Sequence, residues 1–136
     1  MRLDPRFRRA LYGALAALFV TGAAWLLADQ LKADGDPWPD IAAYLLMLHG
    51  GTAMVTLMTL GALVPLHLQR AWLAHRNRIT GTAMATFNAL LITTSFGLYY
   101  AGSENLRPWM SGLHTAVGLA LPALLFVHVL LGRRRS

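Results

Sequence analysis

Four histidines lie in the apolar stretches of this chain, and their positions suggest a binding site. His49 interrupts the apolar run 41–66 and His67 closes it, while His114 and His128 lie in the last apolar run, 109–131. An imidazole inside a membrane span is costly unless it is hydrogen-bonded, faces a cavity or binds a ligand. Histidines at these positions therefore indicate a functional site within the spans.

The spacing within each pair predicts that both of its rings project from one face of a helix. His49 and His67 are 18 residues apart, which is about five whole turns at about 100° per residue. His114 and His128 are 14 residues apart, which leaves them about 40° out of register. Two helices that each carry two stacked imidazoles predict a pair of haems, each held between helices by an imidazole on either axial side.

The composition is typical of an integral membrane protein. Of the 136 residues, 56% are hydrophobic and 13% are charged, and the charged share is about half that of a soluble domain. The absence of cysteine excludes disulfides, thiolate metal sites, iron–sulfur clusters and covalent c-type haem attachment. The net charge of +6 comes from basic residues at the span ends. We interpret these residues as topology signals, with no nucleic acid partner.

The apolar segments predict an all-α fold, a four-transmembrane-helix bundle with up-down-up-down topology. The expected helices are about 11–28, 41–68, 79–101 and 109–131, in a single integral membrane domain covering 1–136. The N-terminal segment, the connection between the second and third helices and the C-terminus hold 10 of the 12 Lys and Arg residues. By the positive-inside rule both termini are cytoplasmic, and we expect a multi-pass protein of a bacterial-type inner membrane.

The His-x13-His spacing of the last helix, the paired histidines of the second helix and the four-span architecture resemble the bis-histidine di-haem membrane cytochromes b, including the cytochrome b561-type four-helix proteins. The resemblance implies two haem b groups, with His49 and His114 ligating the periplasmic haem and His67 and His128 the cytoplasmic haem. It also implies electron transfer between a quinone or quinol pool, or a redox partner protein, and another acceptor. The first pair of histidines departs from the family spacing, because it spans about 27 Å against about 21 Å in the second pair. The periplasmic-side site therefore fits the pattern better than the cytoplasmic-side site.

Haem propionates are anionic, so they need cationic partners at the two membrane surfaces. Arg107 is the only arginine in the predicted outer connections, and Arg70 is an inner candidate together with Arg76 and Arg78. Ordinary topology-setting charge explains each of these arginines as well. His75 lies in the basic connection beyond the second span, where we expect an interfacial residue.

Other functions are compatible with the same residues. A cofactor-free small membrane subunit or assembly factor of a respiratory complex would use the histidines as helix-to-helix hydrogen bonds. A metal or proton transporter would use them as a path, and methionines such as Met54 and Met58 are alternative copper ligands. Glu104 is a candidate proton acceptor beside the outer haem. The chain offers no room for a nucleotide or flavin domain, so we expect an electron-transfer protein or a cytochrome subunit of an oxidoreductase complex, as a homodimer or within a larger assembly.

Overall fold

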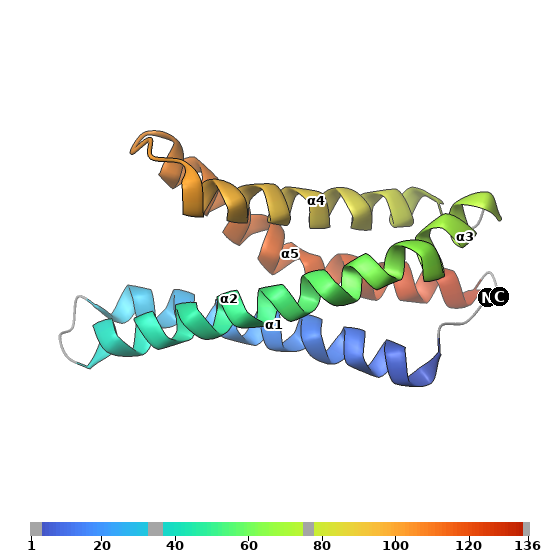
Figure 1. Ribbon diagram of the computed structural model, residues 1–136, viewed down its shortest axis with the longest axis horizontal. Coiled ribbons are helices and arrows are strands. Elements are labelled where there is room, and N and C mark those ends of the chain that lie inside the picture. The colour runs from blue at the N-terminus through green and yellow to red at the C-terminus, as the bar shows by residue number, and fades with distance from the viewer. Residues whose placement is uncertain (1–3, 33–36, 75–77, 135–136) are drawn as a thin grey trace. The chain divides into compact units, whose positions relative to one another are not determined.

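The computed structural model describes residues 4–32, 37–74 and 78–134, and every regular element in them is a helix (Figure 1). The helices are α1 (Pro5–Leu31), α2 (Trp38–Leu63), α4 (Arg78–Tyr100) and α5 (Leu106–Arg134). A π-helical turn (Val64–Leu68) and the short α3 (Gln69–Leu73) continue α2 without a break. The all-α class and the positions of the four predicted helices are therefore confirmed, and three of the four are longer than predicted.

The extra length of α1 comes from an N-terminal cap. The Asp4 carboxylate accepts hydrogen bonds from the backbone N–H groups of Arg6 (2.9 Å) and Phe7 (3.2 Å), and Pro5 stands in the first turn. An aspartate cap followed by proline satisfies donors that have no partner inside the helix. The helix therefore begins at Pro5, ahead of the predicted start at Leu11.

Prolines in the connections stand inside the first turns of the helices that come after them. Pro39 is the second residue of α2, which begins at Trp38. Pro108, just ahead of the predicted start of the last helix at 109, is the third residue of α5, which begins at Leu106. The first N–H groups of a helix have no intrahelical acceptor, so proline costs no hydrogen bond there.

Three helices are long and apolar enough to cross a membrane: Pro5–Leu31, Trp38–Leu73 and Leu106–Arg133. In the described part of the chain α4 is not among them, although it occupies the position of the third predicted span. The cause is its content of threonine and small residues, which lowers its hydropathy. Its hydroxyls bond to the helix itself, as in the 2.7 Å bond from Thr94 Oγ1 to the Leu90 carbonyl.

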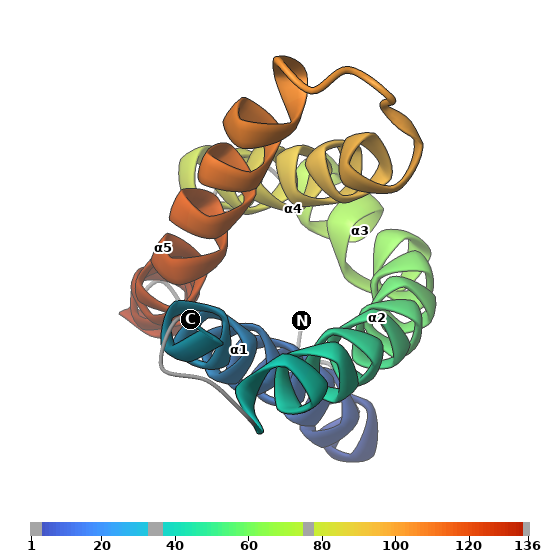
Figure 2. The ribbon, with the colours of Figure 1, turned by 90° about the vertical axis from the view of Figure 1, so that its left-hand side faces the viewer.

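The chain divides into two compact units, Met1–Arg70 and Ala71–Ser136. Within the first unit α1 packs against α2, and within the second α4 packs against α5 (Figure 1 and Figure 2). Each unit is thus an antiparallel helical hairpin, which we call unit 1 and unit 2.

The contacts between α1 and α2 in unit 1 repeat every seven residues. Thr21 Oγ1 lies 3.2 Å from His49 Nδ1, and the Ala14 carbonyl oxygen lies 3.4 Å from Thr56 Oγ1. A step of seven residues on one helix therefore matches a step of seven on the other. Such a period brings the same stripe of each helix to the interface at every second turn, as in antiparallel coiled coils.

One further step of seven along this register places Ala28 opposite Ala42. These two side chains are among the least accessible in the described chain, with 2% and 1% of their surface exposed. Small residues facing each other allow two helix backbones to approach closely, which is how helices associate in a membrane. The pair is thus a closely packed point of the hairpin.

Unit 2 is built on the same period. Thr94 bonds to His114 and Thr80 bonds to His128, so a step of 14 residues, two sevens, separates the contacts on both helices. Between these two contacts on α5 lie two buried apolar side chains, Val117 and Leu121. Both histidines of α5 therefore stand on the interface stripe.

We expect Ala42→Leu to destabilise unit 1, because a larger side chain cannot fit where two alanines meet. Overpacking of this kind costs about 1–3 kcal/mol. Detergent-based or thermal unfolding of the purified protein measures the effect. Ala43→Leu is the matched control, because Ala43 is the neighbouring residue and is exposed. Equal stability of the two variants would contradict the proposed register.

Candidate functional site

His49 of α2 is fixed against α1 through its Nδ1 atom. This nitrogen lies 3.0 Å from the Leu18 carbonyl oxygen and 3.2 Å from Thr21 Oγ1. A carbonyl oxygen only accepts hydrogen bonds, so the network assigns the ring proton to Nδ1. The lone pair of the neutral imidazole is then on Nε2, the ring nitrogen that remains chemically able to ligate a metal.

Hydroxyl groups surround this contact. Thr21 Oγ1 lies 2.8 Å from the Ala17 carbonyl and 3.3 Å from Thr52 Oγ1. Thr52 Oγ1 in turn donates to the carbonyl of His49 itself, at 2.9 Å. In a medium of low dielectric constant such bonds are strengthened, and a network of them holds a ring in one orientation.

Gly22 makes room for the His49 ring. A Cβ atom built on Gly22 would lie 2.8 Å from His49 Cε1 and 3.1 Å from Nδ1. Any larger residue would displace the ring from the Leu18 carbonyl. Thr21 and Gly22 together form what we call the Thr-Gly seat of His49, in which one residue supplies a polar partner and the next supplies the space.

His114 of α5 is held in the same manner by α4. Its Nδ1 lies 2.9 Å from Thr94 Oγ1, and the Thr94 hydroxyl donates its one proton to the Leu90 carbonyl at 2.7 Å. With the Thr94 proton placed on the Leu90 carbonyl, Thr94 Oγ1 accepts from His114 Nδ1–H, and this assignment puts the lone pair on Nε2. Thr94 is 2% exposed, so this bond is shielded from solvent.

His128 is held by Thr80 of α4, because its Nδ1 lies 2.9 Å from Thr80 Oγ1. A Cβ atom built on the adjacent Gly81 would lie 3.9 Å from His128 Cε1, an ordinary van der Waals contact, so this ring does not require a glycine as His49 does. His114 and His128 thus both bond to α4. This confirms the prediction that the two rings project from the same face of α5.

His67 lies in the π-helical turn Val64–Leu68. Pro65 provides the cause, because proline has no N–H and its ring clashes with the carbonyl four residues earlier, that of Gly61. A π turn adds about one residue, which rotates the next part of the helix by about 100° and shortens its rise by about 1.5 Å. The relation of five whole turns between His49 and His67 holds for a regular helix and therefore does not fix where His67 points.

The structure places the four predicted ligands in two units, His49 and His67 in unit 1 and His114 and His128 in unit 2. Within each unit, no described contact joins two of these histidines. The pairing of a histidine from one unit with one from the other stays a prediction from the sequence.

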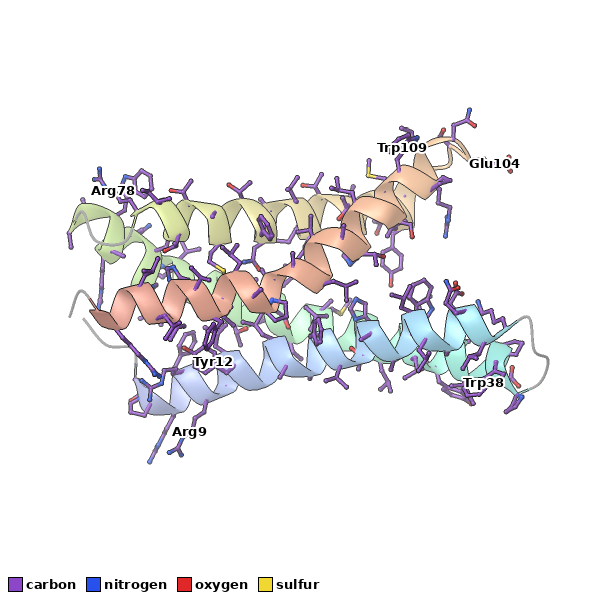
Figure 3. The ribbon with its side chains drawn as sticks, turned by 180° about the vertical axis from the view of Figure 1, so that it is seen from behind. Arg9, Tyr12, Trp38, Arg78, Glu104 and Trp109 are labelled. Atoms are coloured by element: carbon purple, nitrogen blue, oxygen red, sulfur yellow. The ribbon has the colours of Figure 1, made fainter. Side chains whose placement is uncertain are left out.

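The predicted arginines differ in their surroundings. Arg70 and Arg107 are exposed. Arg78 is half-buried at the start of α4 (Figure 3). Its Nη2 donates to the Trp72 carbonyl at 3.0 Å, and its guanidinium lies 5.1 Å from the centre of a Trp72 ring. Its Nε is buried and has no hydrogen-bond partner among the described residues. His75 and Arg76 lie outside the described residues.

Across residues 4–32, 37–74 and 78–134 no three or more His, Cys, Asp or Glu side chains form a group suited to a metal ion. A b-type haem takes only its two axial ligands from the protein. The chemistry of His49 and His114 fits that requirement, because each imidazole has its proton directed to an oxygen acceptor and its lone pair on the other nitrogen.

The anchors of the histidines were not predicted from the sequence. A signal for them does exist, because two threonines of the third helix repeat the 14-residue spacing of His114 and His128, and because a Thr-Gly dipeptide occurs on both α1 and α4. The residues concerned are Thr21, Gly22, Thr80, Gly81 and Thr94.

We expect Gly22→Ala to displace the His49 ring and to destabilise unit 1 by about 1–3 kcal/mol, because the new methyl group would lie too close to His49 Cε1. Gly13→Ala is the matched control on the same helix, since nothing lies within 4 Å of a Cβ there. The control should be neutral, or more stable by up to about 1 kcal/mol through helix propensity. Unfolding of the two purified variants provides the comparison. Similar stabilities would contradict the close contact between Gly22 and the His49 ring.

We expect the ring proton of His114 to be on Nδ1 in the wild-type protein. In Thr94→Val, the imidazole should no longer favour this tautomer. Loss of the acceptor leaves a buried N–H unsatisfied, at a cost of about 1–3 kcal/mol. Nitrogen-15 NMR of histidine-labelled, haem-free protein in lipid bilayers reports the tautomer directly. Thr93→Val, at an exposed neighbouring position, is the control. A wild-type His114 with its proton on Nε2 would disprove the assignment.

No family model, curated protein or solved structure matches this chain. The function is therefore argued from the histidines and the residues that orient them.

Proposed function

We propose that this chain is a membrane-bound b-type cytochrome that binds two haem b groups and transfers electrons across the bilayer. In this proposal His49 with His114 would hold one haem and His67 with His128 the other, as the resemblance to the di-haem cytochromes b implies. One observation carries the proposal: the Nδ1 atoms of His49 and His114 each lie within hydrogen-bond distance of a fixed oxygen on the neighbouring helix, which assigns the ring proton to Nδ1. Metal-ligating histidines almost always have such a partner, which fixes the tautomer and makes the ligating nitrogen more basic.

The residues of the chain have defined tasks in this function. Haem, when bound, supplies one-electron redox chemistry at its iron. Thr21 and Thr94 orient the imidazoles, and the hydrogen bonds they accept tune the electron density of the ligands. The apolar side chains around the histidines exclude water and provide the low dielectric constant that shifts a redox potential. A quinone or quinol, or a redox partner protein, exchanges electrons with the site.

The proposal includes a fourth membrane span. The 23 residues of α4 extend about 35 Å, which exceeds a hydrocarbon core of about 30 Å. The helix pairs with α5, which is itself apolar enough to span. The distribution of basic residues supports up-down-up-down topology with both termini in the cytoplasm of a bacterial-type cell.

A second function is favoured by the same hydrogen bonds. A cofactor-free small membrane subunit or assembly factor requires histidines that bond to neighbouring helices, and His49, His114 and His128 do so. In that case the bonds serve packing alone. The protein would then be colourless, and it would be stable without haem.

Histidine substitutions separate the two functions. If haem is bound as proposed, His49→Ala and His114→Ala each remove the same chromophore from the reduced-minus-oxidised spectrum of the purified protein, and His128→Ala removes the other. His75→Ala, which the sequence places outside the spans, is the control and should leave both. Spectra that are unchanged in His49→Ala and His114→Ala would argue against the proposed ligands.

A further inference from the structure

Arg78 has a buried hydrogen-bond donor that nothing in the described chain satisfies. Its guanidinium is held on one side by the Trp72 carbonyl and lies over the Trp72 ring, while Nε is inaccessible to solvent and has no described acceptor. A charged group that loses water without gaining an acceptor is costly. The position therefore indicates an acceptor that the described residues do not supply.

The charge distribution of unit 2 identifies that ligand as an anion. Residues 71–136 contain one acidic side chain, Glu104. Figure 3 shows Glu104 at the end of the unit opposite to Arg78. No carboxylate side chain of unit 2 is thus available to neutralise the guanidinium. Arginine binds carboxylates and phosphates through parallel N–H donors, and Nε–H is one of them.

Arg78 also lies next to a proposed ligand site. It precedes Thr80 by two residues on the same first turn of α4, and Thr80 Oγ1 holds His128 Nδ1 at 2.9 Å. A haem ligated by His128 carries two propionate carboxylates that must reach polar groups near the membrane surface. The first turn of α4 therefore holds both Thr80, which orients the proposed haem ligand His128, and Arg78, which supplies a positive charge for a haem propionate.

We propose that Arg78 binds an oxyanion, and that this oxyanion is a propionate carboxylate of the haem ligated by His128. The inference rests on the proposed haem function. It assigns the inner anion site to Arg78 and not to Arg70, whose side chain is exposed. The phosphate of an anionic phospholipid has the same chemistry and is the competing source.

The test measures the haem content and the midpoint potentials of wild type, Arg78→Gln, Arg78→Lys and the control Arg70→Gln. Loss of a positive charge beside a propionate favours ferric over ferrous haem. Arg78→Gln should therefore lower the potential of one haem and leave the other unchanged, Arg78→Lys should retain most of the wild-type value, and Arg70→Gln should shift neither.

Reconstitution with haem dimethyl ester, which lacks the carboxylates, identifies the oxyanion. With the ester, Arg78→Gln should no longer differ from wild type. A difference that persists with the ester and depends on the anionic phospholipid content of the vesicles would assign the site to a lipid and overturn the inference. Unchanged potentials in an Arg78→Gln protein that holds two haems would also overturn it, while the proposed cytochrome function would stand. A wild-type protein without haem would overturn both.

Discussion

In both hairpins the same kind of interaction joins the two helices, a hydrogen bond between histidine Nδ1 and an oxygen on the neighbouring helix. An imidazole in an apolar hairpin must have its polar atoms satisfied, and the Leu18 carbonyl and the Thr94 hydroxyl do this for His49 and His114. Gly22 is needed because the ring must approach the backbone of α1. The same bond that makes the histidine tolerable in the membrane leaves the lone pair on the other ring nitrogen, Nε2, which is the atom that would ligate iron in the proposed function.

The seven-residue period of the hairpins explains how these histidine hydrogen bonds relate to the spacing of histidines and threonines in the sequence. In unit 2 two periods separate Thr80 from Thr94 and His114 from His128, so a single register satisfies both bonds. The His-x13-His spacing is thus a property of the interface as well as of a stacked ligand pair. His67 departs from this period, and the π turn at Pro65 shows where the regular helix is lost.

Much of the fold could be predicted from the sequence, because apolar runs and basic flanks are local signals. The four helices and the shared face of His114 and His128 are of this kind. The start of α1 at Pro5 was missed because polar and basic residues precede the apolar run, although Asp4 and Pro5 form a cap signal. Whether Arg70 or Arg78 has a buried donor depends on neighbours in space, such as the Trp72 carbonyl, and spacing alone does not give this. The partners of the histidines were missed for the same reason, since threonines are common in membrane helices.

The decisive quantity for the proposed cytochrome is the number of haems per chain in the detergent-purified wild-type protein. A pyridine haemochrome assay, combined with oxidised and dithionite-reduced visible spectra, gives both the number and the type of haem. We predict a sharp b-type α-band and two haems per chain. A protein that folds in a host with ample haem and shows no Soret band would contradict the proposal, and the histidine hydrogen bonds would then serve helix packing alone.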